Sequence, residues 1–174
     1  MAEKVFKGLV EVYTGDGKGK TSAALGLALR AAGQGMKVIL IQFLKGEPGG
    51  EHFFAGKFKP FEIVQVSKGD LFKKSDDQLM AEARQTLEYA ERALVSGDYD
   101  VVILDEIFIT HWRGFISLQQ ILDLMQKRPD NVELVMTGRR APPEVIKRAD
   151  LVTEMIMIKH PFSEGIKQRK GIDY

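Results

Sequence analysis

The fold is decided by the stretch Tyr13-Thr14-Gly15-Asp16-Gly17-Lys18-Gly19-Lys20-Thr21-Ser22, which separates an apolar run, Leu9–Val12, from an Ala/Leu-rich run, Ala23–Ala32. This order predicts a strand, a glycine-rich loop and a helix, the arrangement of a phosphate-binding loop. Glycines let backbone N–H groups point at a bound anion, and a helix that begins near Lys20 directs the positive end of its dipole at the same place. The strict pattern G-x-x-x-x-G-K-[ST] asks for glycine where this chain has Thr14, so the prediction of nucleotide binding depends on the strand–loop–helix context.

Two side chains at the end of this loop supply a charge and a metal ligand. The Lys20 ammonium is expected to reach the outer phosphates of a nucleotide, and the Thr21 hydroxyl is placed to bind a magnesium ion. The alternative is a glycine-rich turn that binds nothing. Gly-Lys-Thr at the start of a helix, directly after a buried strand, favours the phosphate-binding loop.

A second element predicts the same chemistry from further along the chain. Val101-Val102-Ile103-Leu104 are four apolar strand formers, and Asp105 and Glu106 follow them directly. An apolar strand that delivers carboxylates to its carboxyl end is how a Walker B element is built. Such a strand alone means little, but together with the phosphate-binding loop it predicts a magnesium-nucleotide site.

The remaining pattern alternates strands with helices, which predicts an α/β fold with a mostly parallel sheet and helices on both faces. Further strands are expected at Lys37–Phe43, Phe61–Val66, Val132–Thr137 and Leu151–Lys159. Capping boxes at Ser75–Gln78 and Ser117–Gln120 predict two amphipathic helices, and Pro142 is placed in the first turn of another. The Ala/Leu-rich helix is expected to be buried, the segment Glu47–Lys59 to be a loop, and Met155 and Met157 to fill the core.

Composition bounds the class of protein. At 174 residues, with 44% hydrophobic and 28% charged residues, we expect a single domain over residues 1–174. The absence of cysteine excludes a disulfide framework, a thiolate zinc site and a catalytic thiol, and it fits a cytoplasmic protein. Because 25 basic residues balance 24 acidic ones without a long basic block, nucleic acid is not an expected partner. We see neither a signal peptide nor an apolar run long enough for a membrane, and the three histidines share no metal-binding pattern.

Two positions outside these motifs leave their roles open. Arg139 and Arg140 follow the strand that ends at Thr137, where an arginine could contact phosphate oxygens or form a surface ion pair; the two roles are about equally supported. Phe72 lies in the polar loop after the strand at Phe61–Val66. It is either a ligand-facing aromatic or a core anchor.

Six fragments in order carry a resemblance to a known family. They are Thr14–Thr21, Gln42-Phe43-Leu44-Lys45-Gly46, Leu104-Asp105-Glu106, Thr137-Gly138-Arg139, Lys159-His160 and Gly171-Ile172-Asp173-Tyr174. Together, and nearly from end to end, they resemble the ATP:corrinoid adenosyltransferases of cobalamin biosynthesis and salvage. The resemblance implies a RecA-like P-loop fold, a homodimer, and transfer of the 5′-deoxyadenosyl group of ATP to the reduced cobalt of a corrinoid with release of triphosphate.

The same resemblance implies the substrates and the phosphate site. The substrates would be ATP and a corrinoid, with Mg²⁺ or Mn²⁺ and an electron donor that reduces cobalt. The loop Thr14–Ser22, including Asp16 and Lys18, would bind the nucleotide, with the backbone of Gly15 to Gly19 around the phosphates and Lys20 neutralising them. Arg139 would be a further phosphate contact.

It also implies metal ligands and a corrinoid contact. Thr21 and Glu106 would hold the metal, with Asp105 acting through water, so that Lys20 and Glu106 are the expected catalytic residues. Members of the family place two aromatics of one loop against the corrinoid, and the matching stretch here keeps one, Phe72. Longer members carry an N-terminal extension thought to close the neighbouring subunit's site, whereas this chain reaches its first predicted strand at Leu9.

Two other classes share the loop. A P-loop kinase of the thymidine-kinase type would have it, but such enzymes usually carry a cysteine zinc site and this chain has no cysteine. A RecA-like DNA-binding ATPase is disfavoured by the nearly neutral composition and the single short domain.

Overall fold

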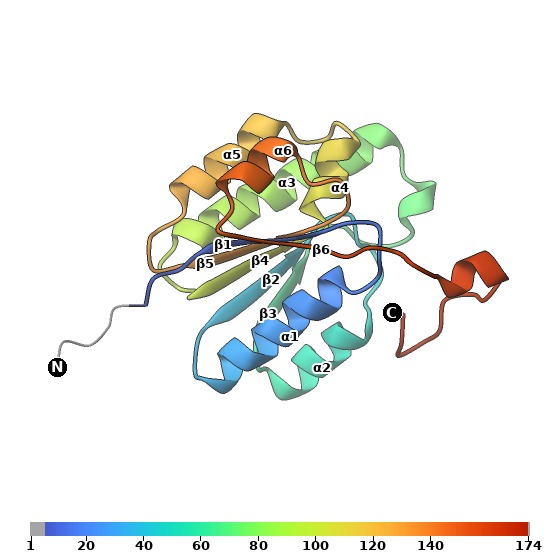
Figure 1. Cartoon of the computed structure of the whole chain (residues 1–174), viewed down its shortest axis with the longest axis horizontal. Helices are drawn as coiled ribbons and strands as arrows, with labels where there is room; N and C mark the ends of the chain where they lie inside the picture. Colours follow the sequence, from blue (N-terminus) through green and yellow to red (C-terminus); the bar gives the residue numbers. More distant parts are fainter. Residues whose placement is uncertain (1–5, 174) are drawn as a thin grey trace.

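The computed structural model describes residues 6–173, whose strands form one parallel sheet (Figure 1). Its six strands run in the order β3-β2-β4-β5-β1-β6, and every neighbouring pair is parallel. The strands are β1 Val10–Thr14, β2 Val38–Gln42, β3 Glu62–Gln65, β4 Val101–Asp105, β5 Glu133–Thr137 and β6 Leu151–Glu154. This arrangement confirms the α/β class and a P-loop-like fold.

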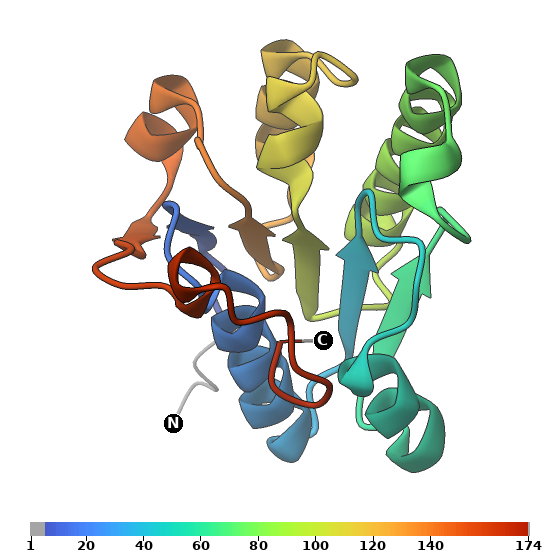
Figure 2. The same cartoon turned by 90° about the vertical axis from the view of Figure 1, so that its right-hand side faces the viewer.

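Helices cover both faces of the sheet, as predicted. They are α1 Lys20–Gly33, α2 Gly50–Phe58, α3 Asp76–Val95, α4 Ile107–Trp112, α5 Leu118–Lys127 and α6 Pro143–Arg148, with short 3-10 turns η1 Leu71–Lys73 and η2 Pro161–Glu164. Figure 2 shows α1 and α2 on one face and the other four helices on the opposite face. Of the helices that the structure describes, none is both long and apolar enough to cross a membrane.

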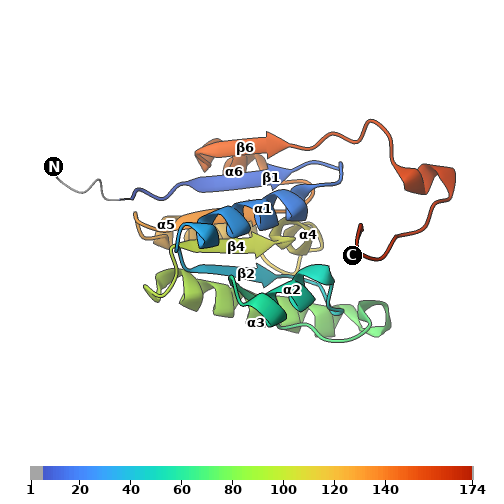
Figure 3. The same cartoon turned by 90° about the horizontal axis from the view of Figure 1, so that it is seen from below.

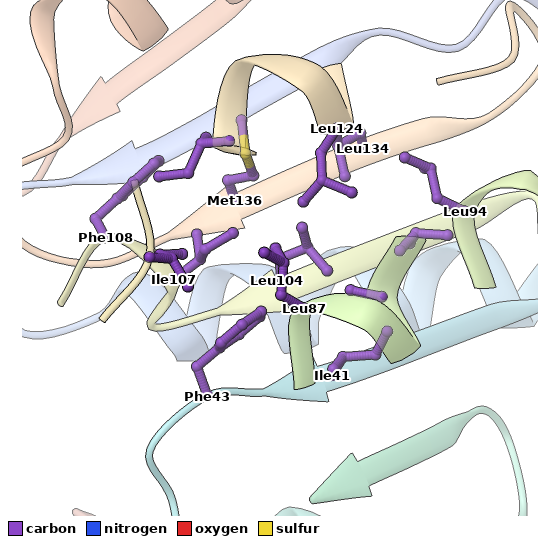
Figure 4. Packing of buried hydrophobic residues seen from close by; sticks show 14 of the residues in the cluster. Ile41, Phe43, Leu87, Leu94, Leu104, Ile107, Phe108, Leu124, Leu134 and Met136 are labelled. Atoms are coloured by element: carbon purple, nitrogen blue, oxygen red, sulfur yellow. The ribbon is translucent and has the colours of Figure 1, made fainter. Parts of the chain in front are cut away.

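The larger part of the core lies between the sheet and α3, α4 and α5 (Figure 4). Ile41, Leu104 and Met136 come from three central strands, and they pack against side chains such as Leu94 and Leu124 from the helices above. A smaller cluster lies under α1. Because β2, β4 and β5 are buried along their whole length, their sequences read as continuous apolar runs rather than alternating ones.

Local signals in the sequence account for the starts of two helices. The Ser75 hydroxyl accepts a hydrogen bond from the Gln78 N–H at 3.3 Å, and the Ser117 hydroxyl accepts one from the Gln120 N–H at 3.2 Å. In each case the glutamine side-chain oxygen accepts a hydrogen bond from the backbone N–H of the capping serine. These reciprocal bonds satisfy donors that a helix start leaves free, so both predicted capping boxes are confirmed.

Two predicted boundaries are wrong. The segment Glu47–Lys59 is not a loop throughout, because residues 50–58 form α2, whose first turn is closed by His52 Nδ1 accepting the Gly49 N–H at 2.9 Å. The last strand was predicted to run to Lys159 but ends at Glu154. β6 pairs only with β1, and β1 ends opposite Glu154 because the phosphate-binding loop turns away there, so the chain beyond has no ladder to extend.

Two burial predictions also need correction. Helix α1 is buried only along the Ala24, Ala28 and Ala31 side, and Leu29 is 55% exposed. Met157 is 48% exposed and does not fill the core, whereas Met155 is half-buried.

Strand order places the predicted functional segments together. β5 lies between β1, which leads into the glycine-rich loop, and β4, which ends in Asp105. All strands are parallel, so the ends of β1, β5, β4 and β2 meet at one edge of the sheet. The C-terminal segment passes beyond this same edge (Figure 3).

Candidate active site

The loop between β1 and α1 wraps around the ammonium of Lys20. Lys20 Nζ donates to the carbonyl oxygens of Gly15 at 2.8 Å and Gly17 at 2.7 Å, and the residue is only 6% exposed. Gly15 and Gly19 have φ angles of 95° and 124°, a region that L side chains rarely adopt. Burial lowers the pKa of Lys20, while the nearby Glu106 carboxylate opposes that shift. The sequence therefore places a confined positive charge at the start of α1, where the helix dipole adds to it.

Asp105 is the most extensively bonded carboxylate of the site. Its Oδ1 accepts hydrogen bonds from the Thr21 hydroxyl at 2.9 Å and the Thr137 hydroxyl at 2.7 Å. Its Oδ2 accepts one from Gln42 Nε2 at 3.1 Å, and Asp105 is only 2% exposed. Asp105 thus connects the loop, β5 and β2, and it orients the Thr21 hydroxyl directly.

Glu106 differs from its neighbour although it follows it in the chain. Its backbone is left-handed, with φ of 61°, and its N–H donates to the Thr137 hydroxyl at 3.0 Å. Burial and the adjacent Asp105 raise the pKa of Glu106, while Lys20 and Arg139 lower it. Within residues 6–173, no hydrogen bond engages its carboxylate, which lines the cavity described next. Glu106 therefore presents a carboxylate to the cavity, close enough to Lys20 for the two charges to act on each other.

Lys20, Thr21 and Glu106 line a cavity of about 1170 Å³. Its lining also includes the rest of the loop residues 16–22, Lys45 and Arg139. Arg139 Nη1 lies 3.7 Å from Asp16 Oδ1, and both side chains are more than half exposed. Arg139 thus forms the surface ion pair and also lines the cavity, while its contact with phosphate stays a prediction.

The remaining predicted residues occupy three kinds of position. Ser22 lines the cavity with the rest of the loop. Thr14 is buried, and its hydroxyl accepts the Ala141 N–H at 3.1 Å. It therefore links the start of the glycine-rich loop to the chain that follows β5. Phe72 is fully exposed and is not among the residues that line the cavity. The possibility that Phe72 anchors the core is therefore wrong.

Lys18 points away from the loop toward the C-terminal segment. Its Nζ donates to the Ile172 carbonyl oxygen at 2.9 Å and pairs with the Asp173 carboxylate. The Gly17 N–H also donates to the Met155 carbonyl oxygen at 2.7 Å, just after β6. The loop is thus bonded on its outer side to the chain that follows the last strand.

Several residues of the site were not predicted as functional. Thr137 and Gln42 are buried polar side chains at the ends of apolar strands, and both bond to Asp105. Glu51 pairs with Lys45, and although burial raises the pKa of Glu51, the bond from Lys45 brings it below its ordinary value. The sequence did contain a signal for Thr137 and Gln42, because each is a polar residue at the carboxyl end of an otherwise apolar strand.

The oxygen donors fit a magnesium ion that also binds phosphate. Thr21, Asp105 and Glu106 supply a hydroxyl and two carboxyl groups at one edge of the sheet. In the described part of the chain, no three His, Cys, Asp or Glu side chains gather into a group that could hold a metal alone. Magnesium usually completes its shell with waters and substrate phosphates rather than with protein ligands only. Among residues 6–173, Glu106 is the carboxylate of this group that lines the cavity without a hydrogen bond.

Comparison with known proteins agrees with this geometry. Residues 6–174 match the model of a family described as ATP:corrinoid adenosyltransferase BtuR/CobO/CobP. This chain belongs to that family. A corrinoid adenosyltransferase of Pseudomonas aeruginosa is 39% identical over 172 residues, covering 97% of this chain and 84% of the relative. The corrinoid adenosyltransferases of Escherichia coli K12 and Salmonella typhimurium are 34% and 32% identical, and each alignment covers 97% of this chain and 86% of the relative.

Family membership confirms the resemblance carried by the six fragments. The matched region contains the phosphate-binding loop, the Asp105–Glu106 pair and the C-terminal segment in one alignment. A P-loop kinase and a DNA-binding ATPase are not favoured by these relatives, whose names all describe transfer to a corrinoid.

Proposed function

We propose that this adenosyltransferase moves the 5′-deoxyadenosyl group of ATP to the reduced cobalt of a corrinoid and releases triphosphate. The observation that carries the proposal is that Lys20, Thr21 and Glu106 line one cavity, with Asp105 bonded to Thr21 behind them, in a chain of this family. Cobalt attacks the 5′ carbon, the carbon–oxygen bond breaks, and the electron pair leaves with the triphosphate. No side-chain nucleophile or strong general base is required.

The protein's task is therefore to position carbon beside cobalt and to stabilise the leaving charge. The N–H groups of the loop and the Lys20 ammonium supply positive charge where the phosphates would lie, and the α1 dipole adds to it. Two bonds to loop carbonyls hold the Lys20 ammonium within the loop. Arg139, at the exposed rim of the cavity, is the proposed further phosphate contact.

For the metal, we propose Thr21 and Glu106 as ligands, with Asp105 behind them. Both oxygens of Asp105 already accept hydrogen bonds, which suits a residue that orients Thr21 and contacts the metal through water. A bound Mg²⁺ or Mn²⁺ would neutralise part of the triphosphate charge. Lys20 and Glu106 remain the proposed catalytic residues.

The proposal extends to partners and compartment. Cobalt must be reduced before it can attack carbon, so an electron donor is a required partner. A homodimer is proposed from the resemblance to the family, and the fully exposed Phe72 is proposed as a contact for the corrinoid. The cysteine-free composition supports a cytoplasmic location.

Product analysis tests the reaction directly. The protein is incubated with ATP, magnesium and chemically reduced corrinoid, and the absorbance change of the new cobalt–carbon bond is followed. Phosphorus NMR of the same mixture is expected to show inorganic triphosphate in proportion to corrinoid consumed. A kinase or motor would cleave the terminal phosphoryl bond instead, so ADP accumulating without triphosphate would contradict the proposal.

A further inference from the structure

The carboxyl end of β2 carries a buried amide that lies between two acids. Gln42 is the last residue of β2 and is fully buried, and it lies opposite Asp105 in the register of β2 and β4. Its Nε2 donates to Asp105 Oδ2 at 3.1 Å and to Glu51 Oε1 at 3.3 Å. Because Glu51 belongs to α2, the Gln42 amide links that helix to the acid at the end of β4.

The two acids decide which way the Gln42 amide points. An ionised carboxylate only accepts hydrogen bonds, so both neighbours need the N–H₂ group. The opposite orientation would place the amide oxygen against two negative charges. Among residues 6–173, no group donates to Gln42 Oε1, although that oxygen is buried. A buried acceptor without a donor is destabilising, so the structure accepts this cost and keeps the N–H₂ group on the acids.

Glu51 is held in place from several sides. Its Oε1 pairs with the Lys45 ammonium, and its side chain is only 13% exposed. Its Oε2 lies over Gly49, where a Cβ would come within 2.5 Å of that oxygen. Glu51 also lies in the first turn of α2, where the helix dipole favours a negative charge. The carboxylate therefore has a fixed place between α2, Lys45 and Gln42.

The backbone around Lys45 is constrained as well. Leu44 is left-handed, with φ of 46°, a region that few residues with a side chain adopt. The Gly69 N–H donates to the Gly46 carbonyl oxygen at 3.0 Å, and a Cβ at Gly46 would lie 1.9 Å from the Gly69 carbonyl oxygen. Strained backbone of this kind gathers at functional sites. The turn that carries Lys45 to Glu51 is thus closely fitted to the loop after β3.

We propose that Glu51 is a positioning residue for the magnesium site and acts through the Gln42 amide. Lys45 holds Glu51, Glu51 orients Gln42, and Gln42 helps to hold Asp105, the acid that orients the Thr21 hydroxyl. Neither Glu51 nor Gln42 touches the metal. The proposal rests on the proposed function, because it needs a metal held beside Asp105. It makes α2 part of the support of the metal site.

The test measures how strongly magnesium tightens ATP binding. Calorimetry gives the dissociation constant of ATP for the whole protein with magnesium and with a chelator, and the ratio of the two constants is the magnesium effect. Glu51→Gln is expected to reduce this ratio about tenfold, the lower end of the loss that follows removal of outer partners of metal ligands. ATP binding in the chelator should not weaken, which shows that the variant's site is folded.

A shorter acid separates position from charge. Glu51→Asp keeps the carboxylate but shortens the side chain by one methylene, so the contact with Gln42 is lost while the charge stays. The positioning role predicts that Glu51→Asp lowers the magnesium effect as Glu51→Gln does. A wild-type magnesium effect in Glu51→Asp would show that Glu51 acts through its charge alone, and the inference would be wrong.

The matched control removes an acid outside the cavity. Glu62 is exposed at the start of β3, its carboxylate accepts a hydrogen bond from the Tyr99 hydroxyl at 2.9 Å, and it does not line the cavity. Glu62→Gln makes the same change of charge as Glu51→Gln and is expected to keep the wild-type magnesium effect. An equal loss in both variants would mean that net charge causes it, which contradicts the inference.

A double-mutant cycle tests the path through Gln42. Gln42→Met removes the N–H₂ group at similar size, and it is expected to lower the magnesium effect by the same factor as Glu51→Gln, with little further loss in the double variant. Additive losses would show that Glu51 does not act through Gln42. Thermal unfolding shows whether Gln42→Met folds, and if it does not, the comparison of Glu51→Asp with Glu51→Gln still decides.

Failure of the proposed function gives a different result. If the wild type binds no ATP, or if magnesium leaves its ATP binding unchanged, the proposed nucleotide and metal site is wrong and the inference falls with it. If magnesium tightens ATP binding equally in the wild type and in every Glu51 variant, only the inference is overturned.

Discussion

The two ends of the sheet each carry a pair of neighbouring acids, and their surroundings differ. At the carboxyl end, Glu106 lines the cavity and feels the charge of the Lys20 ammonium, while Asp105 is buried beside it. Toward the amino end, Glu133 of β5 lies against Glu11 of β1. Burial raises the pKa of Glu133 to about 7, and the nearby Glu11 adds to that shift.

The partners of the amino-end pair are structural ones. Glu133 Oε2 accepts the Leu9 N–H at 2.8 Å, and Glu11 accepts a hydrogen bond from the Tyr13 hydroxyl. Burial and this bond to Glu11 raise the pKa of Tyr13. An acid with a raised pKa is therefore not sufficient to mark a functional site in this protein. The carboxyl end is distinguished by a cavity and by a buried cation, Lys20, whose charge acts on the acids.

The largest effect is expected at the carboxyl end of the sheet. Lys20→Ala removes a charge-assisted contact to phosphate, so the free energy of the transition state should rise by about 2–4 kcal/mol. Adenosylation should therefore fall at least about tenfold at saturating ATP. Steady-state kinetics measure the loss, and thermal unfolding provides the control. Near wild-type turnover with an unchanged melting temperature would show that the nucleotide lies elsewhere.

The next effect concerns Asp105. The Asp105 carboxylate accepts hydrogen bonds from Thr21, Thr137 and Gln42. Asp105→Asn replaces one of its oxygens with an N–H₂ group, which donates and cannot accept, so at least one of these buried donors loses its partner. We expect the free energy of unfolding in urea to fall by about 1–3 kcal/mol.

Glu106→Gln is the matched variant for this measurement. Its carboxylate has no hydrogen bond to lose within residues 6–173, so stability should hold or rise while a higher magnesium concentration is needed for activity. If Glu106→Gln is the less stable variant, or if neither variant changes the magnesium titration, the proposed division between the two acids is wrong.

A smaller effect is expected at the amino end. Since the folded state raises the pKa of Glu133 to about 7, its favourable contribution is present below pH 4.5 and is lost as the pH rises through 7. The free energy of unfolding of the wild type should therefore decline between pH 5 and 8, by about 1–2 kcal/mol from this group. Glu133→Gln should flatten that decline without altering adenosylation. An identical pH profile for both proteins would show that Glu133 is ionised in the folded state.

The smallest structural effect is expected at Phe72. Its side chain is fully exposed, so Phe72→Ala should change the free energy of unfolding by less than about 0.5 kcal/mol. If Phe72 contacts the corrinoid, the KM for corrinoid should rise while ATP affinity stays the same. A rise in the ATP dissociation constant, with unchanged corrinoid kinetics, would instead place Phe72 with the nucleotide.

Sequence reasoning succeeded where local signals and burial agree. The glycine-rich loop, the apolar strand before Asp105 and the two capping boxes each predict one element by a local mechanism, and the structure has all of them. It failed for α2, whose sequence contains two glycines and exposed aromatics. Its first turn is closed by bonds between His52 and Gly49, a start signal that the sequence does not make evident.

The site was predicted only in part because its contacts cross the chain. Asp105 and Lys20 carry recognisable motifs, but Thr137 and Gln42 become site residues only because β5 and β2 flank β4. The C-terminal segment meets the loop at the ion pair between Lys18 and Asp173, which no periodic pattern announces. The early end of β6 likewise follows from where its one neighbour, β1, stops.

The bond between the Gly17 N–H and the Met155 carbonyl oxygen has a consequence for transferring this loop to another protein. A Cβ at Gly17 would lie 2.7 Å from that oxygen, and one at Gly15 would lie 2.4 Å from it. Two requirements therefore restrict Gly15 and Gly17 to glycine. Phosphate must be able to approach the loop backbone on one side, and the backbone at Met155 passes too close on the other side for a Cβ. Transplanting this loop into another protein would therefore also require the chain that follows β6, because the loop backbone bonds to it at Met155.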